Sequence, residues 1–194
     1  MKSSLIALTI TMVAGFAGVT PRASAAAGDN ITFNMVRAAG ATCLSNHAHG
    51  RVTVSDLGPV QNMHVEIVGL TPNNDFTLFI TQHSARTFGL SWYQGEISTD
   101  KEGNGVGDFT GIFSGESFVL ADGPVQMSHV AMWFADPNDA SKAGCAGIVT
   151  PFDGDGQAGI LVLSTENFPD TKGPLQRLGQ NEAHSELTST NSEQ

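Results

Sequence analysis

The sequence predicts an all-β protein, an antiparallel β-sandwich or Greek-key barrel of about eight to ten strands with at most one short helix. Three observations predict this fold. Short stretches of alternating apolar and polar residues recur along the chain, which is the period of half-buried strands. Clusters of Gly, Pro, Asn and Asp separate these stretches, as turns do. No strand–helix–strand alternation occurs, which argues against a parallel α/β fold.

The first half of the domain contains four stretches with strand periodicity. In the first of them Ile31, Phe33 and Met35 fall on one face. Thr71–Asp75 has turn chemistry, because Pro presets one φ angle and Asn and Asp tolerate the left-handed conformation. The predicted strands are 30–37, 50–56, 61–70 and 76–82.

A β-hairpin is predicted at the centre of the chain, over residues 88–113. Its first strand carries Trp92, Tyr93 and Ile97, and its second carries Val106 and Phe109. An acidic, glycine-rich turn over residues 99–105 joins them, and such a pairing is the signature of a hairpin.

The second half of the domain contains shorter strands and one helical turn. Asp136 followed by Pro137 is an N-cap with Pro at the first helical position, and Gly144 ends the helix. Residues 125–135 are apolar on both faces, so we expect both faces of that strand to be covered. The other predicted strands are 117–121 and 159–165, and residues 146–151 form a strand or a loop.

Residues 1–25 predict a secretory signal peptide. Lys2 supplies the positive end, Leu5–Val19 is an apolar run of about 15 residues, and Ala23-Ser24-Ala25 offers a cleavage site. The alternative is a buried N-terminal helix. We therefore expect a secreted protein with a β domain over residues 26–169, no membrane insertion after cleavage, and a flexible polar tail over residues 170–194.

The chain carries 9 basic and 19 acidic residues, a formal net charge of −10. This balance argues against binding of nucleic acid, which requires Lys and Arg. Its two cysteines, Cys43 and Cys145, predict a disulfide in an oxidising compartment, with a metal site as the alternative. Asn30 begins an N-glycosylation pattern, which applies if the source is a eukaryote.

The histidines form the first candidate site. His47 and His49 would share one face of a strand and reach one ion, and three others lie in or beside further strands. Convergence would create a copper or zinc site. The alternative is that they are ordinary polar histidines. The candidate ligands are His47, His49, His64, His83 and His129.

Three aromatic residues form the second candidate, a binding platform for a sugar or a protein partner: Trp92, Tyr93 and Trp133. Adjacent strand residues point to opposite faces, so we expect one of Trp92 and Tyr93 in the core and the other exposed. Packing is the alternative reading of all three.

Two further chemistries have weaker support. Residues 153–156 and 100–105 offer acidic oxygens for calcium, but Ser164 stands where an EF-hand loop starting at Asp153 needs Glu. Ser114 lacks the glycine of a nucleophile elbow, so no hydrolase motif is complete.

Several segments resemble the copper-zinc superoxide dismutase-like sandwich, over about residues 53–163. They are Val68-Gly69-Leu70-Thr71-Pro72, the hairpin from Gly95 through Gly105, and Asp136–Gly144 followed by Gly156–Ile160. The turn is also similar to that of the CHRD modules of exported proteins. Where the family places metal-binding histidines after this turn, the chain has Phe76, Leu78 and Ile80, so the resemblance implies the fold rather than dismutase activity.

We therefore expect an exported, non-catalytic binding or structural protein with an unknown extracellular ligand or protein partner and no cofactor. A copper- or zinc-dependent redox protein that uses the histidines is the alternative, and a small secreted hydrolase is the second alternative.

Overall fold

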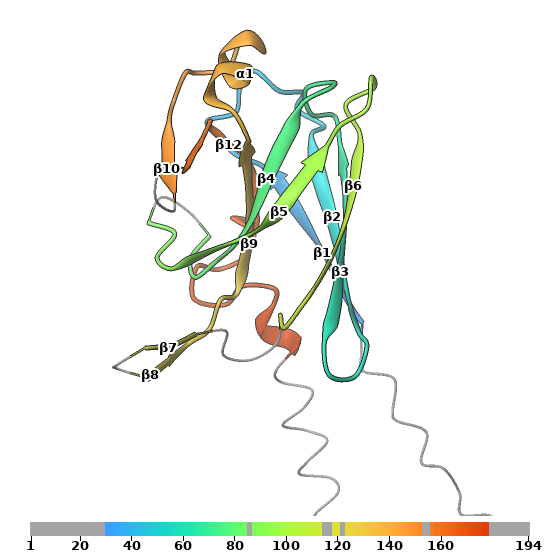
Figure 1. Cartoon of the computed structure of the whole chain (residues 1–194), viewed down its shortest axis with the longest axis vertical. Coiled ribbons are helices and arrows are strands. Elements are labelled where there is room, and N and C mark those ends of the chain that lie inside the picture. Colours follow the sequence, from blue (N-terminus) through green and yellow to red (C-terminus); the bar gives the residue numbers. More distant parts are fainter. Residues whose placement is uncertain (1–29, 85–86, 114–117, 121–122, 153–155, 179–194) are drawn as a thin grey trace, which may run out of the picture.

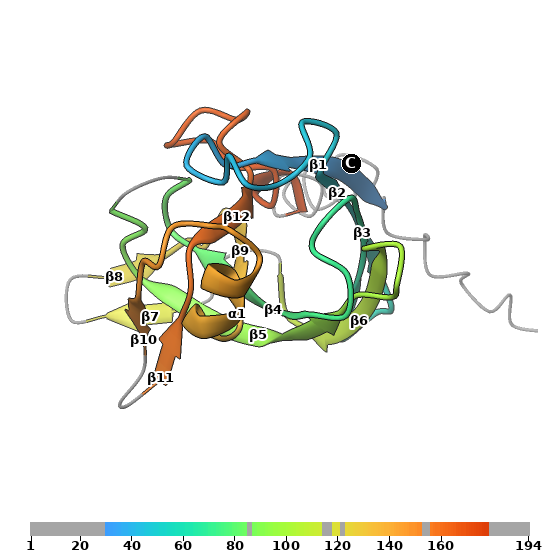
Figure 2. The ribbon, with the colours of Figure 1, turned by 90° about the horizontal axis from the view of Figure 1, so that it is seen from above.

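A computed structural model of the chain describes residues 30–84, 87–113, 118–120, 123–152 and 156–178. The predicted signal peptide and residues 179–194 of the predicted tail lie outside these ranges, as do residues 153–155 of the calcium candidate. The all-β prediction is confirmed, because eight strands form one antiparallel sheet that curls into a nearly closed barrel (Figures 1 and 2). In the described part of the chain, no helix is long and apolar enough to cross a membrane.

Most barrel strands follow the predicted ranges closely, whereas the predicted strand 125–135 begins only at His129 and residues 146–149 lie in no strand. The strands of the barrel are β1 (Ile31–Arg37), β2 (His49–Asp56), β3 (Gln61–Val68), β4 (Asp75–Thr81), β5 (Ser91–Ser98), β6 (Gly105–Gly111), β9 (His129–Phe134) and β12 (Leu161–Ser164). Two small hairpins, β7 (Phe118–Leu120) with β8 (Gly123–Val125) and β10 (Thr150–Phe152) with β11 (Gly156–Ala158), lie outside the barrel, and α1 (Pro137–Lys142) follows β9. Residues 176–178 are also helical, so the expectation of at most one short helix is wrong.

The strands of the barrel lie in the order β5-β4-β9-β12-β1-β2-β3-β6. The chain passes from β3 to β4 without pairing them, since β6 and β5 lie between these strands around the barrel. This is a Greek-key connection. The two edge strands, β5 and β6, are consecutive in the chain and lie beside each other near the turn that joins them (Figure 1).

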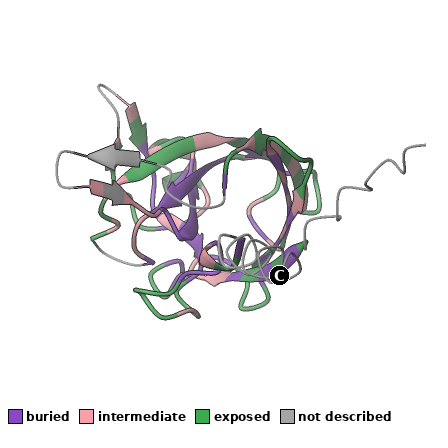
Figure 3. Cartoon of the chain, turned by 90° about the horizontal axis from the view of Figure 1, so that it is seen from below, coloured by how far each residue is buried: buried purple, intermediate pink, exposed green. Residues whose placement is uncertain are grey.

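The hydrophobic core fills the inside of the barrel. Alternate residues of each strand point inward, and the largest of these side chains are fully buried: Met35, Met63, Ile67, Phe76, Leu78, Ile97, Met132 and Phe134. In the view from below, buried segments run through the strands, whereas the connections are mostly exposed (Figure 3). All six residues of β9 are buried, which confirms that both faces of this strand are covered.

The turn between β5 and β6 shows why its residues are acidic and glycine-rich. A carboxylate oxygen of Asp100 accepts hydrogen bonds from the backbone N–H groups of Glu102 at 2.9 Å and Asn104 at 2.8 Å. Gly103 has a φ of +80°, and a Cβ atom there would collide with the carbonyl group of Leu70. Only glycine meets both the conformational and the steric requirement.

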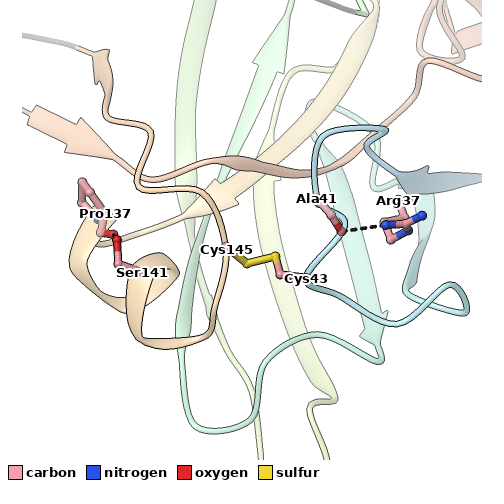
Figure 4. Close-up of a disulfide and its surroundings, with 6 residues drawn as sticks. All are labelled: Arg37, Ala41, Cys43, Pro137, Ser141 and Cys145. Carbon is pink, nitrogen blue, oxygen red and sulfur yellow. Dashed lines mark hydrogen bonds between the residues drawn. A yellow bond between two sulfur atoms is a disulfide. The ribbon is translucent and has the colours of Figure 1, made fainter.

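The disulfide between Cys43 and Cys145 is confirmed, with 5.0 Å between the two Cα atoms (Figure 4). It joins the connection between β1 and β2 to the chain that follows α1. As predicted, the Asp136 side chain caps α1 by accepting a hydrogen bond from Asn138 N at 2.7 Å. Gly144, with a φ of +77°, turns the chain after the helix and so brings Cys145 toward Cys43.

The tail boundary predicted at Asp170 lies too early in the chain. Four residues beyond it are buried, and two of them, Leu175 and Leu178, belong to the main core: Gly173, Pro174, Leu175 and Leu178. Leu175 N also donates a hydrogen bond to Ser128 O at 3.2 Å. Residues 165–178, which we call the C-terminal strap, are therefore part of the folded domain.

Candidate functional site

A second hydrophobic cluster lies on the outer surface of the barrel. The inward residues of β4 alternate with Thr77, Phe79 and Thr81, which point outward because successive strand residues face opposite sides. Phe79 pairs with Ala131 of β9, and Trp133 follows two residues later on the same face. The β10–β11 hairpin contributes Ala158 to this cluster. The outer cluster is thus separate from the core inside the barrel, although β4 and β9 contribute to both.

Five aromatic rings meet at this outer cluster. The ring of Phe79 is at its centre, with its centroid 5.6 Å from Tyr93, 5.3 Å from Trp133 and 5.2 Å from Phe152, all edge to face. Phe88 makes another edge-to-face contact with Trp133 at 5.0 Å. The rings of Tyr93 and Phe152 are nearly parallel, at 10° and 6.2 Å between centroids. Edge-to-face pairs are favourable because the ring edge is positive and the face is negative.

These rings surround an open pocket of about 420 Å³, which we call the aromatic pocket. Its size lies within the range typical of small-molecule sites. It is lined by Phe79, Thr87, Phe88, Gly89, Ser91, Tyr93, Trp133, Thr150, Pro151, Phe152 and Ala158.

The described lining of the aromatic pocket is uncharged at neutral pH. Tyr93 is its one ionisable side chain, and partial burial, with a smaller effect of the nearby Glu96 carboxylate, raises the pKa of the Tyr93 hydroxyl above its ordinary value. The Thr150 hydroxyl donates a hydrogen bond to Gly159 O at 2.9 Å. Within the described part of the chain, the hydroxyls of Thr87, Ser91 and Tyr93 are not bonded to any protein group.

The predicted aromatic platform is brought together in part. Tyr93 and Trp133 line the same pocket, whereas Trp92 pairs with Ile80, whose side chain points into the barrel. The expectation that one of Trp92 and Tyr93 lies in the core is wrong, because their side chains are 53% and 41% exposed. Trp92 lies on β5, which is an edge strand of the sheet, and this position accounts for its exposure.

Sequence reasoning missed three lining aromatics, Phe79, Phe88 and Phe152. Phe79 had one usable signal, its position on the opposite face from Phe76, Leu78 and Ile80. Phe88 and Phe152 lie in or next to connections, where no periodicity indicates a direction.

The predicted histidine ligands are distributed over several places. His47 lies in a turn rather than on a strand, and the Nδ1 group of His49 donates a hydrogen bond to the His47 carbonyl at 2.7 Å. On the outside of β3, His64 Nδ1 lies 2.9 Å from an Asp108 carboxylate oxygen. The Asp108 pKa is lowered by hydrogen bonds from His64 and Asn62.

His83 and His129 both contact Asp170 of the strap. His83 Nδ1 lies 3.0 Å from a carboxylate oxygen of Asp170, although without hydrogen-bond alignment. The fully buried His129 has both ring nitrogens occupied, since Nε2 donates to the Asp170 carbonyl at 3.0 Å and Nδ1 lies 2.9 Å from the Thr165 hydroxyl. Burial lowers the pKa of His129, so the ring is neutral at neutral pH.

His64 is bonded across β3 and β6, and His83 and His129 contact the strap. In the described ranges, no three His, Cys, Asp or Glu side chains are grouped so that they could hold a metal ion. Among the same residues, no serine hydroxyl is hydrogen-bonded to an imidazole; the Ser84 hydroxyl instead donates to Asp170 at 3.1 Å.

Comparison of the sequence with models of known protein families and with curated proteins finds no match. The class of protein is therefore defined by the fold and the site alone: a disulfide-linked antiparallel β-barrel with an aromatic pocket on its outer surface.

Proposed function

We propose that the chain is an exported, non-catalytic binding protein that holds a small uncharged ligand in the aromatic pocket. The observation that carries the proposal is the meeting of five aromatic side chains around about 420 Å³ of open space with an uncharged described lining. Pockets that are mostly apolar, with a few polar groups, are the usual form of small-molecule sites.

Export has separate support. The sequence begins with a segment that has the pattern of a signal peptide, and a disulfide is consistent with an oxidising compartment. The proposal that the protein acts by binding rests on the lack of a complete catalytic motif in the sequence and on the aromatic pocket.

The experiment uses the oxidised chain from residue 26 onward and the neutral fluorescent dye Nile red as a probe. We expect about one dye per chain, bound at least tenfold more weakly after Tyr93→Ala or Phe152→Ala, because each change removes an aromatic wall. Val106→Ala is the matched control, since Val106 is an exposed apolar residue of β6 that does not line the pocket.

The fluorescence of the protein gives a second readout. The chain has a single tyrosine, Tyr93, and two tryptophans, of which Trp133 lines the pocket. A Trp92→Phe variant leaves Trp133 as the only tryptophan, so its emission should shift when the pocket is filled. Dye binding that all three alanine variants retain, or no binding at all, would contradict the proposal.

A further inference from the structure

We infer that the ligand of the aromatic pocket carries an aromatic ring system and few polar atoms. This inference rests on the proposed function and deepens it, because it names the chemical class of the uncharged ligand. Two properties of the pocket carry it, namely the mutual orientation of the rings and the small number of polar groups available to a ligand.

The orientation of the aromatic side chains favours a ligand that contains an aromatic ring. Phe79 already makes three edge-to-face contacts, and Tyr93 and Phe152, which are both partly exposed, line the pocket with nearly parallel rings. A ligand ring placed there can make offset-stacked or edge-to-face contacts with these two side chains. Such contacts favour an aromatic ring beyond the surface area that it buries. A saturated ring of the same size would bury a similar apolar surface but would make no favourable aromatic–aromatic contacts.

The polar groups of the described lining are too few for a sugar. A hexose carries several hydroxyl groups, and each one buried without a partner weakens binding. The pocket offers the hydroxyls of Thr87, Ser91 and Tyr93 and the indole N–H of Trp133, whereas the hydroxyl of Thr150 is bonded to the Gly159 carbonyl. Charged or amide side chains, which pair with adjacent sugar hydroxyls, are not among the described lining residues. One or two polar atoms on the ligand match this supply.

The test compares two ligands that share a skeleton and a hydroxyl group. 2-Naphthol is aromatic, and 2-decalol is its fully saturated counterpart; both are neutral at pH 7. We expect 2-naphthol to bind about tenfold more tightly by titration calorimetry, because two ring–ring contacts are available to it alone. Glucose and the anion 2-naphthoate are the comparison ligands, and both should bind more weakly than 2-naphthol.

Two leucine variants separate aromatic character from apolar area. Tyr93→Leu and Phe152→Leu keep an apolar side chain and remove one ring each, so each should reduce the preference for 2-naphthol over 2-decalol. Phe152 lies on the β10–β11 hairpin outside the barrel, so this variant tests the inference even if Tyr93→Leu disturbs β5.

The outcomes distinguish this inference from the proposed function. Equal affinities for 2-naphthol and 2-decalol would overturn the inference and leave an apolar binding protein. Tighter binding of glucose, or of 2-naphthoate, would overturn it in favour of a sugar or an anion. Failure of all four ligands together with Nile red would overturn both.

Discussion

Removal of the disulfide should cost the protein a large part of its stability. Cys43 and Cys145 are 102 residues apart in the sequence, so the bridge closes a loop that spans most of the barrel. The loop entropy of an unfolded chain predicts a contribution of about 4.7 kcal/mol for about 100 residues. Since domains of this kind are stable by roughly 5–15 kcal/mol, we expect a Cys43→Ala, Cys145→Ala variant to be marginally folded at 25 °C.

The native surroundings of the bridge show that its loss should act mainly on the unfolded state. The connection that carries Cys43 is also held by Arg37, whose Nη1 donates to Ala41 O at 2.7 Å (Figure 4). Cys145 N donates to Ala140 O at 2.9 Å, which keeps the chain after α1 in place. These contacts do not need the disulfide, so we expect the reduced barrel to keep its native packing.

The assay is urea unfolding of the oxidised chain, of the reduced chain and of the double variant, with far-ultraviolet circular dichroism as the signal. Without the disulfide, we expect the free energy of unfolding to fall by about 3–5 kcal/mol, which is on the order of the loop-entropy contribution. The slope of this free energy against urea concentration should become steeper, because the unfolded chain without the bridge exposes more surface. Thr42→Ala, at an exposed neighbour of Cys43, is the control. A loss below about 1 kcal/mol would refute the loop-entropy reasoning.

Two further predictions concern buried polar groups. Burial lowers the pKa of His129 below its ordinary value, so this imidazole binds a proton more readily in the unfolded chain than in the folded one. Protonation of His129 therefore does not reduce the free energy of unfolding above about pH 6.5, and it reduces that free energy as the pH falls below this value. Urea unfolding between pH 7.5 and pH 5 should show this loss, and a His129→Gln variant should have a flatter profile; an equal slope in both would contradict the assignment. The Thr77 hydroxyl is buried without a hydrogen-bond partner among the described residues, so Thr77→Val should raise the unfolding free energy by roughly 1 kcal/mol, whereas an unchanged or lower value in thermal and urea unfolding would show that the hydroxyl is satisfied.

The strands of the barrel were predictable because the alternation of apolar and polar residues lies within each segment of the sequence. In β1 the alternate residues Ile31, Phe33 and Met35 are apolar and buried, as are three alternate residues of β3. The turns between strands contain residues whose backbone preferences are fixed by their own chemistry. The cap of α1 was predictable for the same reason, since Asp136 and Pro137 are adjacent in the sequence. Such features need no knowledge of what lies across the barrel.

The C-terminal strap was missed because its order comes from distant partners. Residues 170–178 have neither strand nor helix periodicity, yet Leu175 is fully buried. The strap is held by His129 and Ser84, which bond to Asp170 from positions 41 and 86 residues earlier in the chain. Only the three-dimensional arrangement of β4 and β9 places these groups side by side.

The aromatic pocket was predictable only in part, for a related reason. The sequence marks Tyr93 and Trp133 as aromatic residues of strands, and the order of the sheet places them on either side of β4. Phe88 lies in the connection between β4 and β5, and Phe152 ends the short strand β10, so their directions depend on how these segments pack against the barrel. The histidines were not predictable as a group, because His47 lies in a turn, His64 bonds to Asp108 on the outside of β3, and His83 and His129 contact the strap.

Because the outer cluster is separate from the barrel core, only some residues of the aromatic pocket are also needed for the fold. Phe79 and Trp133 are almost fully buried and lie on strands whose other faces form the barrel core, so their replacement would disturb the fold as well as the pocket. Tyr93 and Phe152 are both partly exposed, and Phe152 belongs to a hairpin outside the barrel. Substitutions at these two positions change the walls that face a ligand and remove no group from the core. We therefore expect substitutions of Tyr93 and Phe152 to change ligand preference, and substitutions of Phe79 and Trp133 to lower the stability of the fold as well.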